Sequence, residues 1–241
     1  MAIDDALLTE FADTFLGYGN PAAPYWFVGM EEGGGDTAAE IALRLSVWER
    51  RGKRAFEDLA PYSRAVGVGQ WFGERPKLQS TWSKLVRLLL SAEGRGCSTE
   101  DVRSFQRDEL GRPDGDTALT ELLPLPSPST SDWIYGEHSG LGHLASREAY
   151  RAHYAERRAD RIGRLIREHR PPLVVFYGKS YLPWWERVAG RAFRQDDGCG
   201  ALRADAEGTT YLAMPHPVAM GVSNADFERA GRSIAEGPGR V

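Results

Sequence analysis

Short apolar runs alternate along the chain with longer stretches in which apolar residues recur every three or four positions. Four of these runs end at glycine or proline, a pattern typical of buried β-strands. They cover residues 25–30, 118–125, 173–177 and 211–214. Because helical patterns separate the runs, the sequence predicts an α/β fold: a three-layer α/β/α sandwich around a mostly parallel four-stranded central sheet.

The helical patterns are clearest where apolar residues line one face over several turns. The predicted helices cover residues 4–16, 37–52, 81–92, 147–169 and 224–235, with a further helical segment beginning at Trp184. A short helix or an ordered loop is expected over 99–112. Asp36 is the expected N-cap of the helix over 37–52, and Ser223 or Asn224 that of the last helix.

Residues 53–76 have no clear periodicity and are expected to be irregular. We therefore expect one domain over residues 1–241, with an insertion or elaboration at about 36–76. The composition, 41% hydrophobic and 27% charged, is that of an ordinary globular protein. No apolar run reaches 18 residues and the N-terminus lacks a signal-peptide pattern, so we expect a cytoplasmic protein with no membrane span. Two cysteines, Cys97 and Cys199, are too few for a cysteine metal cluster and are expected to be reduced.

The net charge of −4 argues against a protein that coats nucleic acid along its whole surface. The charge is uneven, however. Residues 44–95 hold eleven Lys or Arg against five acids, and residues 146–170 hold eight Arg against four acids. Two interpretations remain open: a local surface that faces phosphates, or ordinary helix faces with solvated arginines.

The run from Tyr25 ends abruptly in a loop with two acids, Glu31 and Glu32, and the three glycines of residues 33–35. In open α/β sheets, sites gather at the carboxyl ends of strands. A ligand site and a merely solvated acidic turn are equally compatible with this stretch. If the four runs form parallel strands, their ends bring Glu31, Glu32, Glu121 and His216 to one edge of the sheet.

Four motifs in this order resemble those of the uracil-DNA glycosylase superfamily. They are Gly29-Met30-Glu31-Glu32-Gly33 after the first run, a second run that ends in prolines, Val-Val-Phe-Tyr-Gly in the third, and His216-Pro217-Val218-Ala219-Met220-Gly221 after the fourth. The resemblance spans roughly residues 25–235. It implies a monofunctional DNA glycosylase that binds DNA as a monomer and needs neither a metal nor a cofactor.

The resemblance also implies roles for individual residues. Glu31, with Glu32 as the second candidate, matches the acid or Asn that positions the hydrolytic water. His216 matches the histidine that stabilises negative charge on the departing base, and Met220 the apolar residue that wedges into the duplex. The chemistry agrees, because breaking an N-glycosidic bond leaves positive charge on the sugar and negative charge on the base.

Glu121 falls where many members of this superfamily place an Asn that reads the base edge. An ionised carboxylate accepts hydrogen bonds, as from the N4 amino group of cytosine, so we expect a cytosine-derived or otherwise modified base to be favoured over uracil. Removal of modified cytosines from phage DNA would suit such an enzyme. The remaining candidates are base contacts from Gly29, Met30 and Phe72, stacking by Trp71 or Trp133, and DNA contacts from Pro217, Val218, Lys179 and Ser180.

Two other functions remain open. One is a non-catalytic nucleic-acid-binding module on the same fold, and the other is a nucleoside hydrolase or transferase that acts on free nucleosides. Purely structural roles also remain open: a turn histidine at 216, a core methionine at 220, and at 121 an acid paired with an arginine. His138 and His143 are expected to be ordinary loop histidines.

Overall fold

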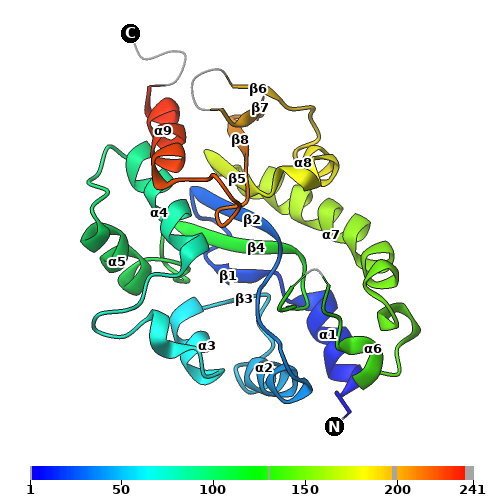
Figure 1. Cartoon of the computed structure of the whole chain (residues 1–241). Helices are drawn as coiled ribbons and strands as arrows, with labels where there is room; N and C mark the ends of the chain where they lie inside the picture. The colour runs from blue at the N-terminus through cyan, green and yellow to red at the C-terminus, as the bar shows by residue number, and fades with distance from the viewer. Residues whose placement is uncertain (1, 130, 197–199, 237–241) are drawn as a thin grey trace.

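The computed structural model describes residues 2–129, 131–196 and 200–236. The chain forms an α/β structure in which helices cover both sides of one mixed sheet (Figure 1). The described strands are β1 (Gly17–Gly19), β2 (Tyr25–Glu31), β3 (Phe56–Glu57), β4 (Thr117–Leu123), β5 (Leu173–Tyr177), β6 (Arg194–Gln195), β7 (Leu202–Ala206) and β8 (Thr209–Met214). All eight belong to the same sheet, in the order β3-β1-β4-β2-β5-β8-β7-β6.

The predicted mostly parallel, four-stranded sheet is wrong in its size, because the sheet has eight described strands and is mixed as a whole. The four expected strands form as β2, β4, β5 and β8, which are neighbours and pair in parallel. Four further strands extend the sheet, and the pairs β1–β4, β7–β8 and β6–β7 are antiparallel. The added strands escaped prediction because β1 is Gly-Tyr-Gly, β3 and β6 have two residues each, and β7 reads Leu-Arg-Ala-Asp-Ala.

Two helical layers enclose the sheet. The described helices are α1 (Asp5–Thr14), α2 (Ala38–Arg50), α3 (Leu59–Ala65), α4 (Ser80–Ala92), α5 (Thr99–Asp108), α6 (Tyr135–His138), α7 (Arg147–His169), α8 (Leu182–Ala189) and α9 (Asn224–Ala235). Helices α4 and α9 lie on one side of the sheet, and α7 and α8 on the other (Figure 1). The predicted helices over 4–16, 37–52, 81–92, 147–169 and 224–235 are thus confirmed, and residues 99–112 include a helix.

Local signals account for most of the helix ends. Ser223 caps α9 through a hydrogen bond from the backbone N–H of Asp226, so the first of the two proposed caps is confirmed. The expected cap of α2 is wrong: Thr37 accepts the hydrogen bond from the N–H of Glu40, whereas Asp36 lies one residue outside the helix. A side-chain oxygen can cap the helix only from the position where it reaches a free N–H of the first turn.

The stretch over 53–76 is more regular than expected. It contains β3, α3 and a 3₁₀ turn over Gly69–Trp71. Strand β3 lies beside β1 at one edge of the sheet. These elements are too short to produce a hydrophobic period, which explains why the sequence pattern missed them.

Helix α7 connects β4 to β5 and brings an arginine to the candidate site. The hydroxyl of Ser146 caps its start, and Arg170, which adopts a left-handed conformation before Pro171, follows its last residue. Because α7 links two parallel strands, β4 and β5, it runs back along the sheet from the carboxyl ends towards the amino ends. Its first residue, Arg147, consequently lies beside the end of β2.

Close backbone approach holds α4 and α9 together. A Cβ added at Gly231 on α9 would lie 2.1 Å from the carbonyl oxygen of Leu88 on α4, so glycine is required at this crossing. Cys97 is a partly buried free thiol, and Cys199 lies outside the described residues. In the described part of the chain, no helix has the length and apolarity needed to cross a membrane.

Candidate active site

The carboxyl ends of β2, β4, β5 and β8 meet at one edge of the sheet. Strands β4 and β5 flank β2 on its two sides. The chain therefore passes from β2 to β4 on one side and then crosses to β5 on the other. The strand order therefore reverses at β2. In open α/β sheets, such a reversal opens a crevice outside the strand ends, where ligands bind.

Three residues at this edge lie side by side on neighbouring strands. Glu121 on β4 is the register partner of Gly29 on β2, and Tyr177 ends β5 on the other side of β2. The Tyr177 hydroxyl donates a hydrogen bond to Oε1 of Glu121 at 2.5 Å. The two side chains therefore meet across β2.

Glycine at position 29 makes this pairing possible. A Cβ at Gly29 would lie 2.2 Å from Oε2 of Glu121 and 2.3 Å from the Tyr177 ring. Any side chain would collide with both partners. Gly29 was expected to contact a base, and in the structure its immediate neighbours are these two side chains.

The Glu121 carboxyl is unusually easy to protonate. The residue as a whole is only half-buried, but Oε2 is shielded from solvent and has no hydrogen-bond partner among the described residues. The pKa of Glu121 is raised to about 8, mainly by burial and also by the charges of Glu32 and Glu31, while the Tyr177 hydrogen bond and the charge of Arg158 oppose the rise. A large part of the Glu121 population is therefore neutral at pH 7.

Among the described residues, no arginine forms an ion pair with this carboxyl. Arg158 on α7 is close, but its guanidinium donates to the backbone carbonyls of Glu121, Leu122 and Phe15. The interpretation of Glu121 as an acid paired with an arginine is therefore wrong. Arg158 instead satisfies carbonyl groups at the end of β4, and burial lowers its pKa to about 10.

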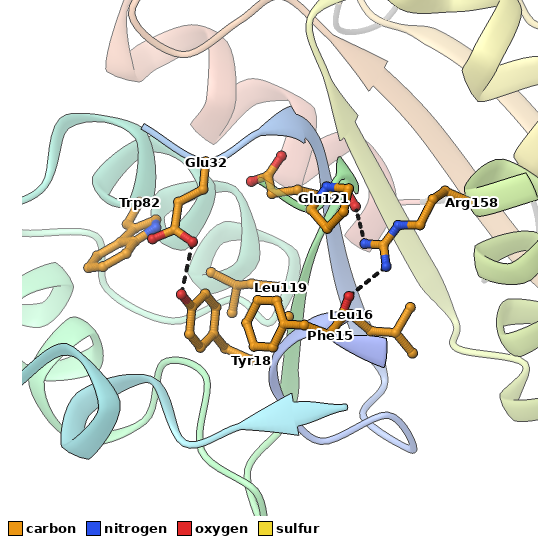
Figure 2. Close-up of a pocket in the computed structure, with 10 residues that line it drawn as sticks. Phe15, Leu16, Tyr18, Glu32, Trp82, Leu119, Glu121 and Arg158 are labelled. Atoms are coloured by element: carbon orange, nitrogen blue, oxygen red, sulfur yellow. Dashed lines mark hydrogen bonds between the residues drawn. The ribbon is translucent and has the colours of Figure 1, made fainter. Parts of the chain in front are cut away.

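A small cavity lies beside the Glu121 side chain. Its walls include Phe15, Tyr18, Glu32, Trp82, Glu121 and Arg158 (Figure 2). Its volume of about 40 Å³ leaves room for roughly three water molecules. A nucleobase needs more space than this cavity offers.

The two acids after β2 face different partners. Oε2 of Glu31 accepts a hydrogen bond from Arg147 at 2.5 Å, and both side chains are nearly buried. Oε1 of Glu31 is buried without a partner among the described residues. Burial raises the pKa of Glu31, and Arg147 opposes the rise.

Glu32 lines the cavity but has both carboxylate oxygens engaged. Oε2 accepts from the Tyr18 hydroxyl at 2.9 Å, and Oε1 accepts from Arg44 on α2 at 3.0 Å. Figure 2 shows Glu32 between Tyr18 and Trp82. Glu31 therefore keeps one carboxylate oxygen without a partner among the described residues, whereas Glu32 lines the cavity with both of its oxygens hydrogen-bonded.

The loop after β8 carries His216 beside Tyr177. The two rings make an edge-on contact with centroids 5.9 Å apart. Nδ1 of His216 accepts a long hydrogen bond from the N–H of Val218 at 3.4 Å. Burial lowers the pKa of His216, and the nearby ammonium of Lys84 lowers it further. His216 is therefore mainly neutral at pH 7.

Lys84 on α4 holds this loop at both ends. Its ammonium donates to the carbonyl oxygen of Pro217, and to that of Val222 at 3.0 Å. Between these anchors, Met220 is 100% exposed and Val218 is 56% exposed. The interpretation of Met220 as a core residue is therefore wrong.

The other predicted contacts are spread more widely. Phe72 is buried against Trp82, with ring centroids 5.7 Å apart, and does not line the cavity. Lys179 donates to the carbonyl oxygen of Gly200 at 2.8 Å, and Ser180 is exposed beside it. Met30 is partly buried against the core.

The candidate stacking residues have neighbours within the protein. The expectation of two loop histidines is wrong for His138, which ends α6, and His143 lies in a 3₁₀ turn over Gly142–Leu144. Trp71 is partly buried, and its backbone carbonyl accepts from Gln106. Trp133 packs under the Arg147 guanidinium, 5.1 Å from its ring centroid. His143 stacks on His153 at 4.2 Å. In residues 2–129, 131–196 and 200–236, no group of three His, Cys, Asp or Glu side chains is placed to hold a metal ion together.

Several arginines of the two basic regions have partners within the protein. Arg44 binds Glu32, Arg87 binds Glu228 and Arg147 binds Glu31. This favours a structural explanation for part of the local charge excess. Exposed arginines such as Arg151 stay compatible with contacts to phosphates.

Sequence reasoning missed Tyr177, Tyr18, Arg147 and Lys84. Tyr177 had a usable signal, because it is the last residue of a predicted strand at the predicted edge. The others come from elements whose placement the sequence does not reveal. Comparison with models of known protein families found no match, and comparison with curated proteins found none either.

Proposed function

We propose that the protein is a monofunctional DNA glycosylase that hydrolyses the N-glycosidic bond of a flipped-out uracil-like or modified base. One observation carries the proposal. A single loop over 215–222 places His216 against the Glu121–Tyr177 pair and exposes Met220 completely. A site that takes a base out of a duplex needs these two features together: polar groups for the base and an apolar group for the gap it leaves.

Glu31 is the proposed water-positioning group. Its Oε1 lacks a partner among the described residues, and Arg147 holds the other oxygen, so the carboxyl has a defined orientation and one oxygen available for water. A raised pKa suits a general base, since proton transfer is most effective when the pKa approaches the working pH. The negative charge would also stabilise the positive sugar of the transition state.

His216 is the proposed partner of the departing base. Because Nδ1 accepts the Val218 N–H, the proton of the neutral ring lies on Nε2. That N–H can donate to an oxygen of the base as negative charge develops on it. A donor of this kind contributes about 3 kcal/mol to stabilisation of the transition state.

The exposed loop supplies the proposed DNA contact. Met220 fills the space of the extruded nucleotide, and Val218 lies against the neighbouring stack. Pro217, which the sequence predicted as a further DNA contact, is buried. Lys179 and Ser180, which follow β5, contact the sugar-phosphate backbone of the DNA. The protein is proposed to act as a monomer in the cytoplasm, without a metal or a cofactor.

The alternative with an observation in its favour is a non-catalytic DNA-binding module. The cavity is smaller than a base requires, and both oxygens of Glu32 are engaged. In such a module, the exposed loop would bind DNA while no base entered. A nucleoside hydrolase or transferase is the third possibility, and it has no use for an exposed methionine.

The test is release of bases from a panel of oligonucleotides. The panel carries uracil, hypoxanthine, thymine mismatches, hydroxymethylcytosine and glucosylated hydroxymethylcytosine, and free nucleosides are assayed in parallel. The proposal predicts release from one class of oligonucleotide and its loss in Glu31→Ala and His216→Ala. Glu32→Gln separates the two acids, because it keeps the shape of the cavity wall.

A matched control uses His169, which ends α7 at the opposite edge of the sheet and lies near Trp26. His169→Ala is expected to release bases at the wild-type rate. DNA binding without release from any oligonucleotide would favour the binding module. Release only from free nucleosides, with no affinity for DNA, would favour the small-molecule enzyme.

A further inference from the structure

The function proposed above assigns no individual task to Tyr177, which lies between Glu121 and His216 in the site. It is 6% exposed, ends β5, and reaches across Gly29 to the Glu121 carboxyl. The space for this contact exists only because residue 29 has no side chain. The same tyrosine ring contacts His216.

This contact leaves the Glu121 carboxyl with one available oxygen. Tyr177 occupies Oε1, and Oε2 is shielded from water and has no partner among the described residues. Glu121 also lines the cavity. A buried polar atom without a partner costs free energy, so an occupant that hydrogen-bonds to Oε2 would recover that cost.

We propose that Tyr177 is a specificity-determining residue: it engages Oε1 of Glu121 so that Oε2 alone meets the edge of a base, as a donor when the carboxyl is neutral and as an acceptor when it is ionised. The proposal rests on the glycosylase function proposed above. In the neutral form, Oε2–H matches a base with a carbonyl oxygen, such as O4 of uracil. In the ionised form, Oε2 matches an amino group, such as N4 of cytosine.

The groups around Glu121 determine which form prevails. Glu31 and Glu32 approach from the end of β2, Tyr177 from β5, and Arg158 from α7. Beyond them, Arg44 and Tyr18 are bound to Glu32, and Lys84 on α4 faces His216. Burial and the two acids outweigh the cations, which agrees with a pKa of about 8.

The site therefore has opposite preferences on the two sides of pH 8. Below it, the neutral carboxyl favours a carbonyl-bearing base, and above it the carboxylate favours an amino-bearing base. This revises the sequence-based expectation, which assumed an ionised carboxylate and hence a cytosine-like base at neutral pH.

Binding of two non-hydrolysable oligonucleotides tests the proposal. They carry 2′-fluoro-2′-deoxyuridine or 2′-fluoro-2′-deoxycytidine at the same position, and their dissociation constants are measured from pH 6 to pH 10. The wild-type protein is expected to prefer the uridine strand about tenfold at pH 6.5 and to lose or reverse this preference by pH 9.5.

Tyr177→Phe removes the hydrogen bond that stabilises the ionised carboxyl, so the pH at which the preference changes should rise by roughly one pH unit. Tyr181→Phe is the matched control. Tyr181 follows the same strand and packs edge-on against Trp185, 6.2 Å between centroids, away from the cavity. Tyr181→Phe should leave unchanged the pH at which the base preference reverses, which we call the crossover pH.

Carboxyl ¹³C NMR gives a readout that does not depend on DNA. The Glu121 signal, assigned by its loss in Glu121→Gln, should titrate near pH 8 and move to higher pH in Tyr177→Phe. If Tyr177→Phe binds the two strands with the same crossover pH as the wild type, the role of Tyr177 is overturned and the proposed function is left intact. Binding of neither strand, with the carboxyl titrating as expected, would overturn the proposed function and the specificity role that depends on it.

Discussion

Replacing Glu121 with glutamine is expected to remove a large part of the pH dependence of the protein's stability. The folded-state pKa of Glu121, about 8, lies above its ordinary value of 4.5 because the carboxyl is buried near two other acids. The folded state therefore holds a proton that the unfolded chain releases. Stability from this proton is complete below pH 4.5 and is lost as the pH rises through 8.

The size of the effect follows from the two pKa values. They differ by about 3.5, and each pKa unit corresponds to about 1.4 kcal/mol, so the limiting loss is about 5 kcal/mol. Because the side chain is half-buried rather than fully enclosed, solvent screening reduces this value. We expect Glu121 to account for about 2–3 kcal/mol of lost stability between pH 5 and pH 8.5.

Glutamine imitates the neutral form of this side chain. Its amide oxygen can accept from Tyr177, and its amide nitrogen replaces the protonated Oε2. At pH 5, Glu121→Gln should unfold within about 1 kcal/mol of the wild type. At pH 8.5 the variant should be the more stable protein, by about 2 kcal/mol. The pKa of Glu31 is also raised, so the free energy of unfolding of both proteins should keep a smaller decrease with rising pH.

The assay is urea unfolding at several pH values, with free energies taken by linear extrapolation. Glu74→Gln, at an exposed position outside the sheet, controls for the general loss of one acid. It should follow the wild-type curve. Parallel curves for the wild type and Glu121→Gln across this pH range would refute a buried neutral carboxyl at position 121.

Three further predictions concern the parts of the site. Gly29→Ala places a Cβ 2.2 Å from the Glu121 carboxyl, so it should destabilise the protein by about 1–3 kcal/mol in urea unfolding and weaken base release. Met220→Ala should change stability by less than about 0.5 kcal/mol, since the side chain is fully exposed, but should reduce base release from duplex DNA more than from single strands. Lys84→Met removes a cation that lowers the pKa of His216, so NMR titration should find that pKa higher than in the wild type.

Each of these predictions has a control and a contradicting result. Gly33→Ala adds a Cβ into open space after β2 and should leave stability nearly unchanged; an equal loss in both glycine variants would contradict the steric argument. Equal loss of release from duplex and single strands in Met220→Ala would argue against a wedge. For Lys84→Met, Lys77→Met is the comparison, and an unchanged His216 titration would show that the ammonium is not close enough to matter.

The sequence by itself determined the elements whose signal is local. Helix α7 over Arg147–His169 and strand β5 over Leu173–Tyr177 agree with their predicted bounds, because the hydrophobic pattern that marks each element lies within its own segment. The same local signals predicted that the chain carries acids and a histidine just after buried strands.

Only the tertiary structure decided how those groups meet. Glu121 and Tyr177 are 56 residues apart, and their contact depends on strand order, on register and on the missing side chain of Gly29. Strand β1 joins the sheet by pairing with β4, which no pattern in Gly-Tyr-Gly indicates. Periodicity reports which face of an element is apolar, but the pKa of a carboxyl depends on what surrounds it in space. For that reason the sequence indicated an ionised base-reading acid at 121, whereas the fold buries that acid and favours its neutral form.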